Sequence, residues 1–300
     1  NITKSLEHMA HGGQILTTLE TWNIASSFSE SLLGGPQALD LGGHVLQKGA
    51  KSYDGVISKQ IVQLVPCELA YDYFDARRQL DGQQGGERCD ESGCDNDFLQ
   101  ERTGRQFPPV KTLRQVSASF HDAPYLNNEV TIAFLSTCEV ENHYDDAETR
   151  LTALSRFVAH LLHTFSGGYQ CKSSMLAFSS CEEGIRFGLR LMDALQQCED
   201  KLLEGAPVAP CFLRYGCMHG PYDTMGANPM TGRADYFGRV VNRAARIASA
   251  AELGTVCVGV VASEELVLDD PTGIRTVPMG TKRLKGLQED MSLYLCTQEL

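Results

Sequence analysis

One segment, DYFGRVVNRAAR (235–246), concentrates the polar side chains that could do chemistry in this chain. Asn242 and Arg246 are four positions apart, so on a helix they share one face, while Arg243 is turned away from it. An amide and a guanidinium on one helical face can hydrogen-bond a sugar and a phosphate together, because the planar, permanently charged fork of arginine matches phosphoryl oxygens. The same spacing is also found on a solvated helix face that carries only surface ion pairs.

Two lysines add positive charge to an otherwise acidic protein. Lys172 lies in a predicted hairpin at 169–179, and Lys285 lies in the tripeptide LKG. Each lysine by itself is typical of a protein surface. The chain has 26 Lys+Arg against 38 Asp+Glu, a formal net charge of −12. A groove for a nucleic-acid backbone requires a basic excess, so this composition argues against nucleic acid as a partner.

The elements that must position these residues alternate in type. The segment EVTIAFLST (129–137) predicts a strand, because Val130, Ile132 and Phe134 alternate onto one face. Helical spacing of apolar residues predicts helices over 146–165 and 240–251, and Ser180 with Glu183 forms a capping-box pattern that begins another helix. Further strands are predicted at 212–220, 254–261 and 290–297, with the hairpin at 169–179. The order β-α-β-β-α-β, followed by a helix and a strand, predicts an α+β fold of the ferredoxin-like, split βαβ kind with its helices on one face of the sheet.

The chain also contains an internal repeat. Residues AHGGQILTT (10–18) align with AELGTVCVG (251–259), and the same offset of 241 places Asn1 on Asn242. Two further blocks follow in the same order: GGHVLQKG (42–49) aligns with MGTKRLKG (279–286), and KQIVQLVP (59–66) with MSLYLCTQ (291–298). Residues 1–66 are therefore predicted to be the C-terminal part of a first domain, whose whole version occupies 127–300. The intervening linker, 67–126, is expected to be mobile at 81–97, where it is polar, acidic and rich in glycine.

Residues 127–300 resemble the catalytic domain of the class III nucleotidyl cyclases, the adenylyl and guanylyl cyclases, over its whole length. The resemblance rests on TIAFLST, GGYQCKSSMLAF, LRYGCMHGPY, ADYFGRVVNRAARIA and GTKRLKGL, of which DYFGxxVNxAAR is the most specific. Residues 1–66 resemble the last third of the same domain through AHGGQILTT and DLGGHVLQKG.

The resemblance assigns a role to each of five residues in the second copy. It implies that Lys172 and Asp235 contact the base, a pair that favours ATP over GTP. It further implies that Asn242 orients the ribose, that Arg246 stabilises the pentacoordinate phosphorus, and that Lys285 holds the terminal phosphates.

The two metal-binding aspartates of the family are missing from this copy. The F-x-D position carries Ser136, and the K-x-x-G-D position carries Leu176 after Met175. Neither side chain offers the carboxylate oxygens that a hard divalent cation requires. The resemblance therefore implies that Mg²⁺ or Mn²⁺ is bound by a partner domain, a second cyclase homology domain in cis or in trans. In the alignment of the two copies Ser5 takes the place of Arg246, as expected of a metal-providing half, whose aspartates would precede residue 1.

Two functions remain open at this stage. The first is that of one half of a tandem adenylate cyclase, which converts ATP to 3′,5′-cyclic AMP and pyrophosphate. The second is that of a catalytically inactive cyclase-homology module that regulates or dimerises, and the lost metal ligands motivate it. The scattered cysteines and the lack of a long apolar run predict a cytoplasmic location, with any membrane attachment outside residues 1–300.

Overall fold

The computed structural model describes residues 2–28, 35–48, 56–66, 107, 110–111, 114–137, 147–165, 167–200, 212–268 and 273–298. These residues form two compact units. Unit 1 comprises Asn1–Ala123 together with Met225–Asp235, and unit 2 comprises Pro124–Thr224 and Tyr236–Leu300. The linker segment expected to be mobile, 81–97, lies outside the described residues. No helix in the described part of the chain is long and apolar enough to cross a membrane.

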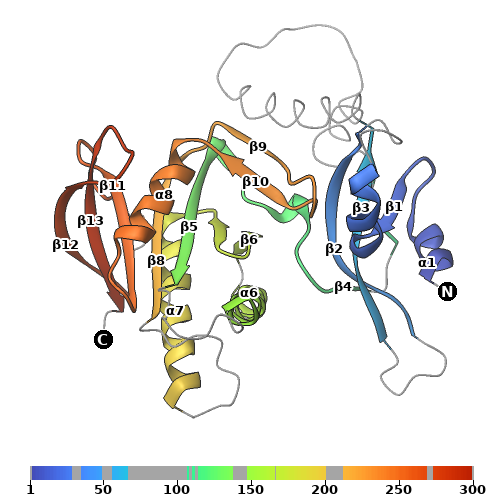
Figure 1. The fold of residues 1–300 in the computed structure, drawn as a ribbon, viewed down its shortest axis with the longest axis horizontal. Coiled ribbons are helices and arrows are strands. Elements are labelled where there is room, and N and C mark those ends of the chain that lie inside the picture. Colours follow the sequence, from blue (N-terminus) through green and yellow to red (C-terminus); the bar gives the residue numbers. More distant parts are fainter. Residues whose placement is uncertain are drawn as a thin grey trace, which may run out of the picture. The chain divides into compact units, whose positions relative to one another are not determined.

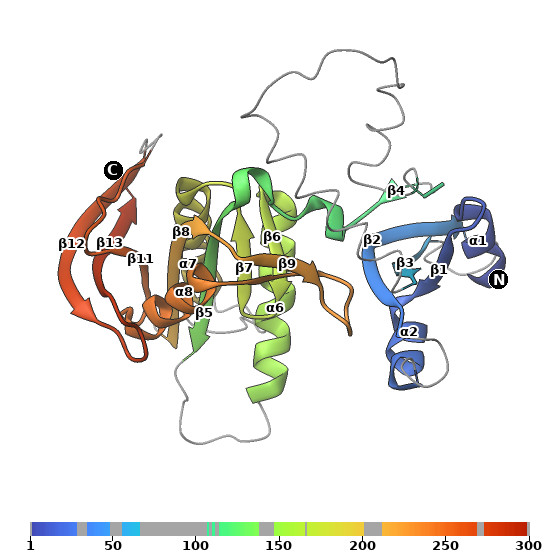
Figure 2. The ribbon, with the colours of Figure 1, turned by 90° about the horizontal axis from the view of Figure 1, so that it is seen from above.

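Unit 2 is built on a seven-stranded sheet with the order β12-β13-β11-β8-β5-β7-β6, which Figure 2 shows from left to right. Strand β5 pairs antiparallel with β7 and β8, and β11 runs parallel to β8. The elements of this unit are η3 (Leu126–Asn128), β5 (Glu129–Thr137), α6 (Ala147–Thr164), β6 (Gly168–Lys172), β7 (Met175–Phe178), α7 (Cys181–Asp200), β8 (Leu213–Pro221), α8 (Arg239–Ala250), β11 (Thr255–Val261), β12 (Ile274–Arg283) and β13 (Asp290–Gln298).

Helices cover both faces of this sheet, and not one face as the element order had predicted. The hydroxyl of Tyr215 donates to the carbonyl of Gly184 in α7 at 2.6 Å. The next residue, Gly216, faces α8, because a Cβ atom there would lie 2.2 Å from the amide nitrogen of Ala248. Since successive strand residues point to opposite faces, α7 and α8 pack on opposite sides of β8. Helices α6 and α7, which belong to the β-α-β-β-α-β order, cover one face of the sheet as predicted. Helix α8 comes after that order in the chain and covers the other face.

Helix α7 begins with part of the predicted capping box, and α6 and α7 pack on the sheet through their apolar sides. The Ser180 hydroxyl accepts from the Glu183 amide at 3.2 Å, which is one half of the predicted capping box. The Glu183 carboxylate accepts instead from the amide of Ser179, one residue earlier than the motif requires. Between α6, α7 and the sheet lies the main apolar core, which includes Ala133, Leu135, Leu154, Val158, Leu176, Phe178, Ile185, Phe187, Leu191, Leu195 and Tyr215.

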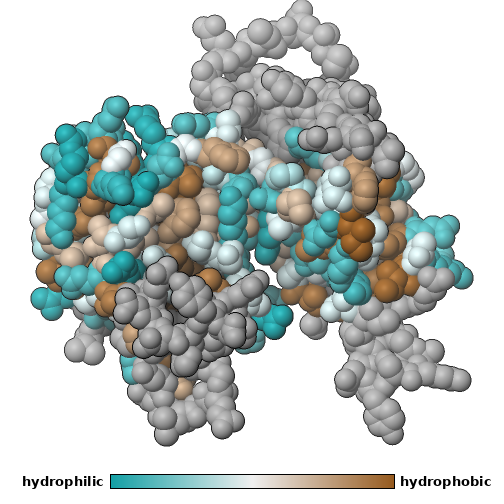
Figure 3. Space-filling view, in the orientation of Figure 1, coloured by the Kyte–Doolittle hydropathy of each residue, from teal (hydrophilic) through white to brown (hydrophobic). Residues whose placement is uncertain are grey.

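Unit 1 contains a smaller sheet with the order β1-β3-β2-β4. Its apolar side chains pack in two small clusters, one around Met9 and Ile61 and one around Trp22. Large apolar side chains remain exposed on this unit, among them Ile15, Ile24 and Phe28, and Figure 3 shows apolar patches on its surface. The elements are α1 (Ile2–Met9), β1 (Ile15–Thr18), α2 (Leu19–Ala25), η1 (Ser26–Phe28), β2 (Gln37–Lys48), β3 (Val56–Val65), β4 (Arg114–Gln115) and η2 (Phe120–Asp122).

The strand registers of the two units repeat one another. Ile15 pairs with Leu64 as Val256 pairs with Cys296. In unit 1, β3 pairs with β1 on one side and with β2 on the other, and in unit 2, β13 pairs in the same way with β11 and β12. The strand orders are therefore β1-β3-β2 and β11-β13-β12. A helix precedes the first strand in each case (Figure 1). The order of elements and their pairing are therefore the same over this stretch.

The hairpins also share a β-bulge, which corrects one detail of the sequence alignment. The register shifts between Asp40 and Gly42 in β2 and between Pro278 and Gly280 in β12. Gly42 and Gly280 both have a positive φ, 89° and 85°, a conformation that favours glycine. Gly280 therefore corresponds to Gly42, whereas the letter alignment had matched it with Gly43. Strand β2 has a second bulge between Val45 and Gln47. From Gln47 onward the structural correspondence again agrees with the sequence alignment of 42–49 with 279–286.

Residues of the second copy contribute a separate hairpin. Strands β9 (Thr224–Ala227) and β10 (Ala234–Phe237) form a two-stranded sheet of their own (Figure 1). The tip of this hairpin, Met225–Asp235, packs as part of unit 1 although the sequence assigns it to the second copy. We call this segment the hairpin tip.

Candidate nucleotide site

Helix α8 exposes the two residues that the sequence placed on one face. Val240, Ala244, Ile247 and Ala248 of this helix are buried, whereas Asn242 and Arg246 are exposed. The apolar residues recur at helical spacing, so one side of the helix packs on β8 and the other side is free to contact a ligand. The prediction that Asn242 and Arg246 share an accessible face is confirmed.

Arg243, predicted to turn away from that face, ties α8 to the turn that carries Lys285. Its Nη2 atom lies 2.9 Å from Oε1 of Glu289, just before β13. A backbone hydrogen bond and, to a smaller extent, the nearby Arg243 cation hold the pKa of Glu289 below its ordinary value. Leu284 anchors the same turn because it is buried beside the exposed Lys285. The ion pair therefore links the helix of Asn242 and Arg246 to the turn of Lys285.

Lys172 is exposed at the end of β6, where it pairs with Met175 across a tight turn. Strand β6 forms one edge of the seven-stranded sheet, and β12, which leads to Lys285, forms the other edge. The two lysines thus come from strands at opposite edges, and the sheet alone does not bring them together.

Asp235 differs from the other four predicted residues because it is buried, with 6% of its surface exposed. It ends the hairpin tip, and its Oδ2 atom accepts from Nδ2 of Asn228 at 3.4 Å. It belongs to unit 1, whereas Lys172, Asn242, Arg246 and Lys285 belong to unit 2. Asp235 therefore lies in a different unit from the other four predicted residues.

The residues at the two metal positions do not fit a divalent cation. Leu176 is fully buried in the core with Ala133 and Leu135. Ser136 follows Leu135 along β5, so it points to the opposite face of the sheet. The strand pairing places Met175, and not Leu176, opposite Phe134 on the Ser136 face. Among the described residues, no group of three His, Cys, Asp or Glu side chains is placed to hold a metal.

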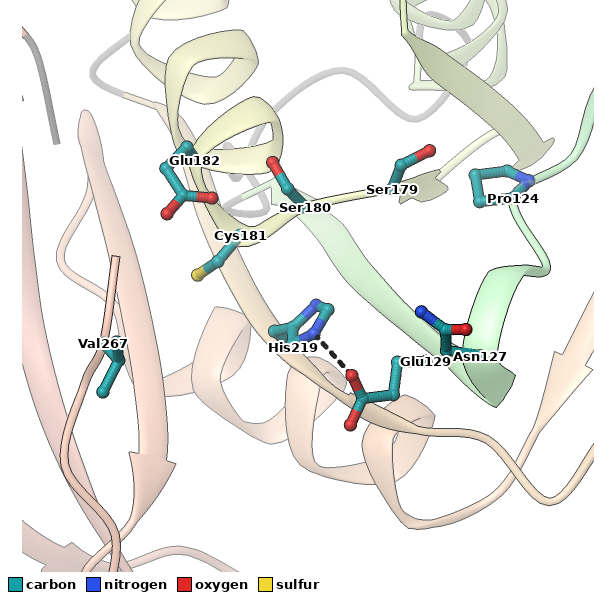
Figure 4. A pocket seen from close by; sticks show the side chains of 9 residues that line it. All are labelled: Pro124, Asn127, Glu129, Ser179, Ser180, Cys181, Glu182, His219 and Val267. Carbon is teal, nitrogen blue, oxygen red and sulfur yellow. Dashed lines mark ion pairs between the residues drawn. The ribbon is translucent and has the colours of Figure 1, made fainter. Parts of the chain in front are cut away.

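A cavity of about 290 Å³ opens in unit 2 at the start of α7, and none of the five predicted residues lines it. Figure 4 shows the Glu129 carboxylate turned toward the ring of His219, with 3.5 Å between Oε2 and Nε2. The other ring nitrogen of His219 lies 2.9 Å from the hydroxyl of Thr131. The cavity is lined by Pro124, Asn127, Glu129, Ser179, Ser180, Cys181, Glu182, His219 and Val267.

Sequence reasoning overlooked a buried charged pair in unit 1. Asp40 is fully buried, and its Oδ2 atom lies 3.4 Å from Nε of Arg233 in the hairpin tip. Burial raises the pKa of Asp40 to about 6, against the opposing effects of Arg233, the Gly42 amide and Gln60. The available signal was a single aspartate inside the apolar run QALDLGG (37–43), because buried carboxylates are rare unless they are paired.

A family model and several solved structures are similar to part of this chain. Residues 153–298 match the family model described as "Adenylate and Guanylate cyclase catalytic domain". The match begins after β5, so the strand with Ser136 lies outside it. No curated protein sequence matches the chain.

Solved structures of cyclases are similar to somewhat more than half of this chain. An adenylate cyclase from Trypanosoma brucei is 20% identical, with 58% of this chain and 93% of that chain covered and a TM-score of 0.43. The guanylate cyclase domain of RhGC from Catenaria anguillulae, in complex with GTP, is 17% identical, with 57% and 97% covered and a TM-score of 0.44. An adenylate/guanylate cyclase/hydrolase from Silicibacter pomeroyi is 18% identical, with 57% and 97% covered and a TM-score of 0.45.

The α8 motif lies inside the family match. Residues 153–298, just under half of the chain, are similar to the adenylate and guanylate cyclase catalytic domains.

Proposed function

We propose that this chain supplies the base-binding and transition-state half of a tandem adenylate cyclase. The observation that carries the proposal is helix α8, which exposes Asn242 and Arg246 on one side and is tied through Arg243 and Glu289 to the turn of Lys285. In the reaction the ribose 3′-oxygen attacks the α-phosphorus of ATP and loses its proton. The bond from that phosphorus to the bridging oxygen breaks, and pyrophosphate leaves with 3′,5′-cyclic AMP as the product.

Each residue has a distinct task in this proposal. Asn242 orients the ribose so that its 3′-oxygen is in line with the bond that breaks. Arg246 stabilises the negative charge that develops on the phosphoryl oxygens, a charge for which guanidinium is the best-matched side chain. Lys285 holds the terminal phosphates, and Lys172 with Asp235 selects adenine.

The divalent cation that the family uses does not fit the residues of this copy. Ser136 supplies a single hydroxyl, and Leu176 is an apolar core residue. We therefore propose that a partner cyclase homology domain binds Mg²⁺ or Mn²⁺, and that residues 1–66 are the end of such a domain.

The open edge of β1 supports the truncated first copy. Its counterpart β11 pairs with β13 on one side and with β8 on the other. In the described part of unit 1, β1 pairs only with β3 and lies at the edge of its sheet. Ile15 is 54% exposed there, whereas Val256 at the equivalent register position is 1% exposed. A first copy of full length would cover this edge.

A mixing assay with Mn²⁺ and ATP tests the proposal, with cyclic AMP as the readout. The 300-residue chain is assayed alone and then with a complete first domain from the same protein. We expect activity only in the mixture and its loss in the Arg246→Ala variant. A mixture that forms the complex but makes no cyclic nucleotide would contradict the proposal.

The second candidate function is an inactive cyclase-homology module that regulates by dimerising. Leu176 favours it, because a core residue stands where the family has a metal ligand. The same assay separates the two candidates: complex formation without turnover, unchanged by Arg246→Ala, is the result expected of such a module.

A further inference from the structure

The hairpin tip is held on the first-copy sheet of unit 1 by a backbone bond and an ion pair. The amide of Asp40 in β2 donates to the carbonyl of Gly232 at 2.7 Å. The Oδ2 atom of Asp40 lies 3.4 Å from Nε of Arg233. Asp40 has no exposed surface, and the side chain of Arg233 is 24% exposed. Breaking a buried pair leaves an uncompensated charge, so this contact strongly favours one position of the tip.

The two oxygens of the Asp40 carboxylate have different partners. Oδ1 accepts from the amide of Gly42 at 2.8 Å and from Nε2 of Gln60. Both of these donors belong to the first copy, so they orient the carboxylate from one side. Oδ2 is left facing Arg233 of the second copy. The first copy thus presents an oriented carboxylate to the arginine.

A second contact holds the other side of the hairpin tip. The indole Nε1 of Trp22 in α2 donates to the carbonyl of Pro229 at 3.0 Å. Trp22 is 2% exposed, and it is the single tryptophan of the chain. Buried indole N–H groups need an acceptor, and this one is provided by the second copy.

A chain of hydrogen bonds connects these anchors to Asp235. Gly232, which accepts from Asp40, donates its own amide to the carbonyl of Asn228 at 2.7 Å. The Nδ2 atom of Asn228 then donates to Oδ2 of Asp235 at 3.4 Å. Asn228 also accepts from the amides of Met230 and Thr231, which fixes its side chain. Arg233 lies only two residues before Asp235.

We propose that Asp40 and Trp22 of the first copy are positioning residues for Asp235, and that they thereby set the base preference of the second copy. This inference rests on the proposed function, because it takes Asp235 as a base-contacting residue. Asp40 and Trp22 do not touch the substrate themselves. They hold the hairpin tip, and the tip holds Asp235. The first copy, which has Ser5 where the second has Arg246, thus contributes to nucleotide recognition through this contact.

The docking of the hairpin tip is measured first, without nucleotide, in the 300-residue chain. The variant Gly232→Ala places a Cβ atom 2.6 Å from the Asp40 amide nitrogen at a φ of +66°, so the tip must move. Gly226→Ala is the matched control, because a Cβ atom there meets nothing within 4 Å. We expect amide hydrogen exchange at Asp40 to rise by about tenfold or more in Gly232→Ala. We also expect the emission of Trp22 to shift, with neither change in Gly226→Ala.

Base selection is measured next, in the longer protein that contains a complete first domain. Arg233→Met removes the partner of Asp40 without changing the backbone. Its control is Lys59→Ala, which breaks the ion pair between Lys59 of β3 and Glu20 of α2. We expect Arg233→Met to raise the KM for ATP and to lower the preference for ATP over GTP by about tenfold, while kcat changes less than about twofold. Lys59→Ala should leave all three unchanged.

The outcomes separate this inference from the proposed function. The positioning role is overturned if the exchange rate at Asp40 is unchanged in Gly232→Ala. It is also overturned if the hairpin tip is displaced in Arg233→Met while the preference for ATP over GTP stays the same. Binding of ATP and of GTP is measured beside turnover, so a protein that binds but does not turn over still reports selectivity. If the wild-type protein makes no cyclic nucleotide and binds neither ATP nor GTP, both the proposed function and the role in base selection are contradicted. The measured docking of the hairpin tip by Asp40 and Trp22 does not depend on that outcome.

Discussion

At the scale of single residues, Arg246 is the side chain on which the proposed chemistry depends most. It is exposed on α8 while its neighbours Ala244 and Ile247 are buried, so replacing it leaves the helix packing intact. We expect Arg246→Ala to lower kcat on the order of 10²–10³-fold with a small change in KM, because its interaction forms in the transition state. Steady-state kinetics of the reconstituted enzyme measure this, with the exposed Arg190→Ala on α7 as the control. A loss confined to KM would assign Arg246 to ground-state binding.

The carboxyl group of Asp40 makes unit 1 sensitive to pH. Its pKa is raised by burial from 3.8 to about 6, with Arg233, Gln60 and the Gly42 amide opposing the shift and Asp122 adding to it. Because the pKa is higher in the folded state, protonation favours folding. The stabilisation is complete below about pH 4 and is lost as the pH rises through 6. The shift corresponds to about 3 kcal/mol in the free energy of unfolding.

Urea denaturation followed by the emission of Trp22 tests this dependence, since this residue reports on unit 1. Because Asp40 contributes to the free energy of unfolding only when protonated, we expect unit 1 to be more stable at pH 5 than at pH 7.5. We expect Asp40→Asn to remove most of that difference. The asparagine keeps an acceptor for Gly42 and Gln60 but cannot ionise. A pH dependence that survives in Asp40→Asn would assign it to other groups.

At the scale of the secondary-structure elements, the Arg243–Glu289 ion pair joins α8 to the β12–β13 turn. The turn is also fastened by Arg283, which contacts the Gln288 carbonyl and lies 3.1 Å from Asp290. These contacts restrict where Lys285 can reach relative to the helix. The helix that carries Arg246 and the turn that carries Lys285 are thus held as one part.

We expect Glu289→Gln to raise the KM for ATP by about threefold to tenfold while kcat changes little, because Lys285 would contact the phosphates less often. The charge-exchanged variant Arg243→Glu/Glu289→Arg should restore most of the affinity, since the pair is re-formed in the opposite sense. ATP titrations of the reconstituted enzyme measure both. An equal KM in wild type and Glu289→Gln would show that the ion pair does not position Lys285.

At the scale of the whole molecule, the two units share a strand arrangement in different surroundings. Val256 is 1% exposed beneath strands and helices, while Ile15 at the same register position is 54% exposed. Replacing each by threonine therefore has different consequences. Val256→Thr buries a hydroxyl and should cost about 1–3 kcal/mol in the free energy of unfolding, whereas Ile15→Thr should change it by less than about 0.5 kcal/mol.

The same pair of variants tests the proposal that residues 1–66 are the end of a longer domain. In a longer protein with a complete first domain, the edge of β1 would be covered, and Ile15→Thr should become about as costly as Val256→Thr. Denaturant unfolding of both proteins measures this. An Ile15→Thr variant that stays neutral in the longer protein would contradict the proposed pairing at β1.

Features that depend on local periodicity and spacing were predictable from the amino-acid sequence alone. The helical repeat of apolar residues gave α6 and α8 nearly to the residue, alternation gave β5, and the four-residue spacing of Asn242 and Arg246 placed them on one exposed face. Each of these follows from interactions within one element, which a sequence pattern records directly.

Which surfaces meet is evident only from the packing of the elements in three dimensions. It placed α8 on the opposite face from α7, and it put Leu176 in the core on the other side of the sheet from Ser136. It also assigned the hairpin tip to unit 1, where Arg233 meets Asp40 across more than 190 positions of sequence. No local pattern encodes such contacts, because they arise from packing between elements distant in the chain. The buried charge of Asp40 is stable there only because the fold brings it a partner.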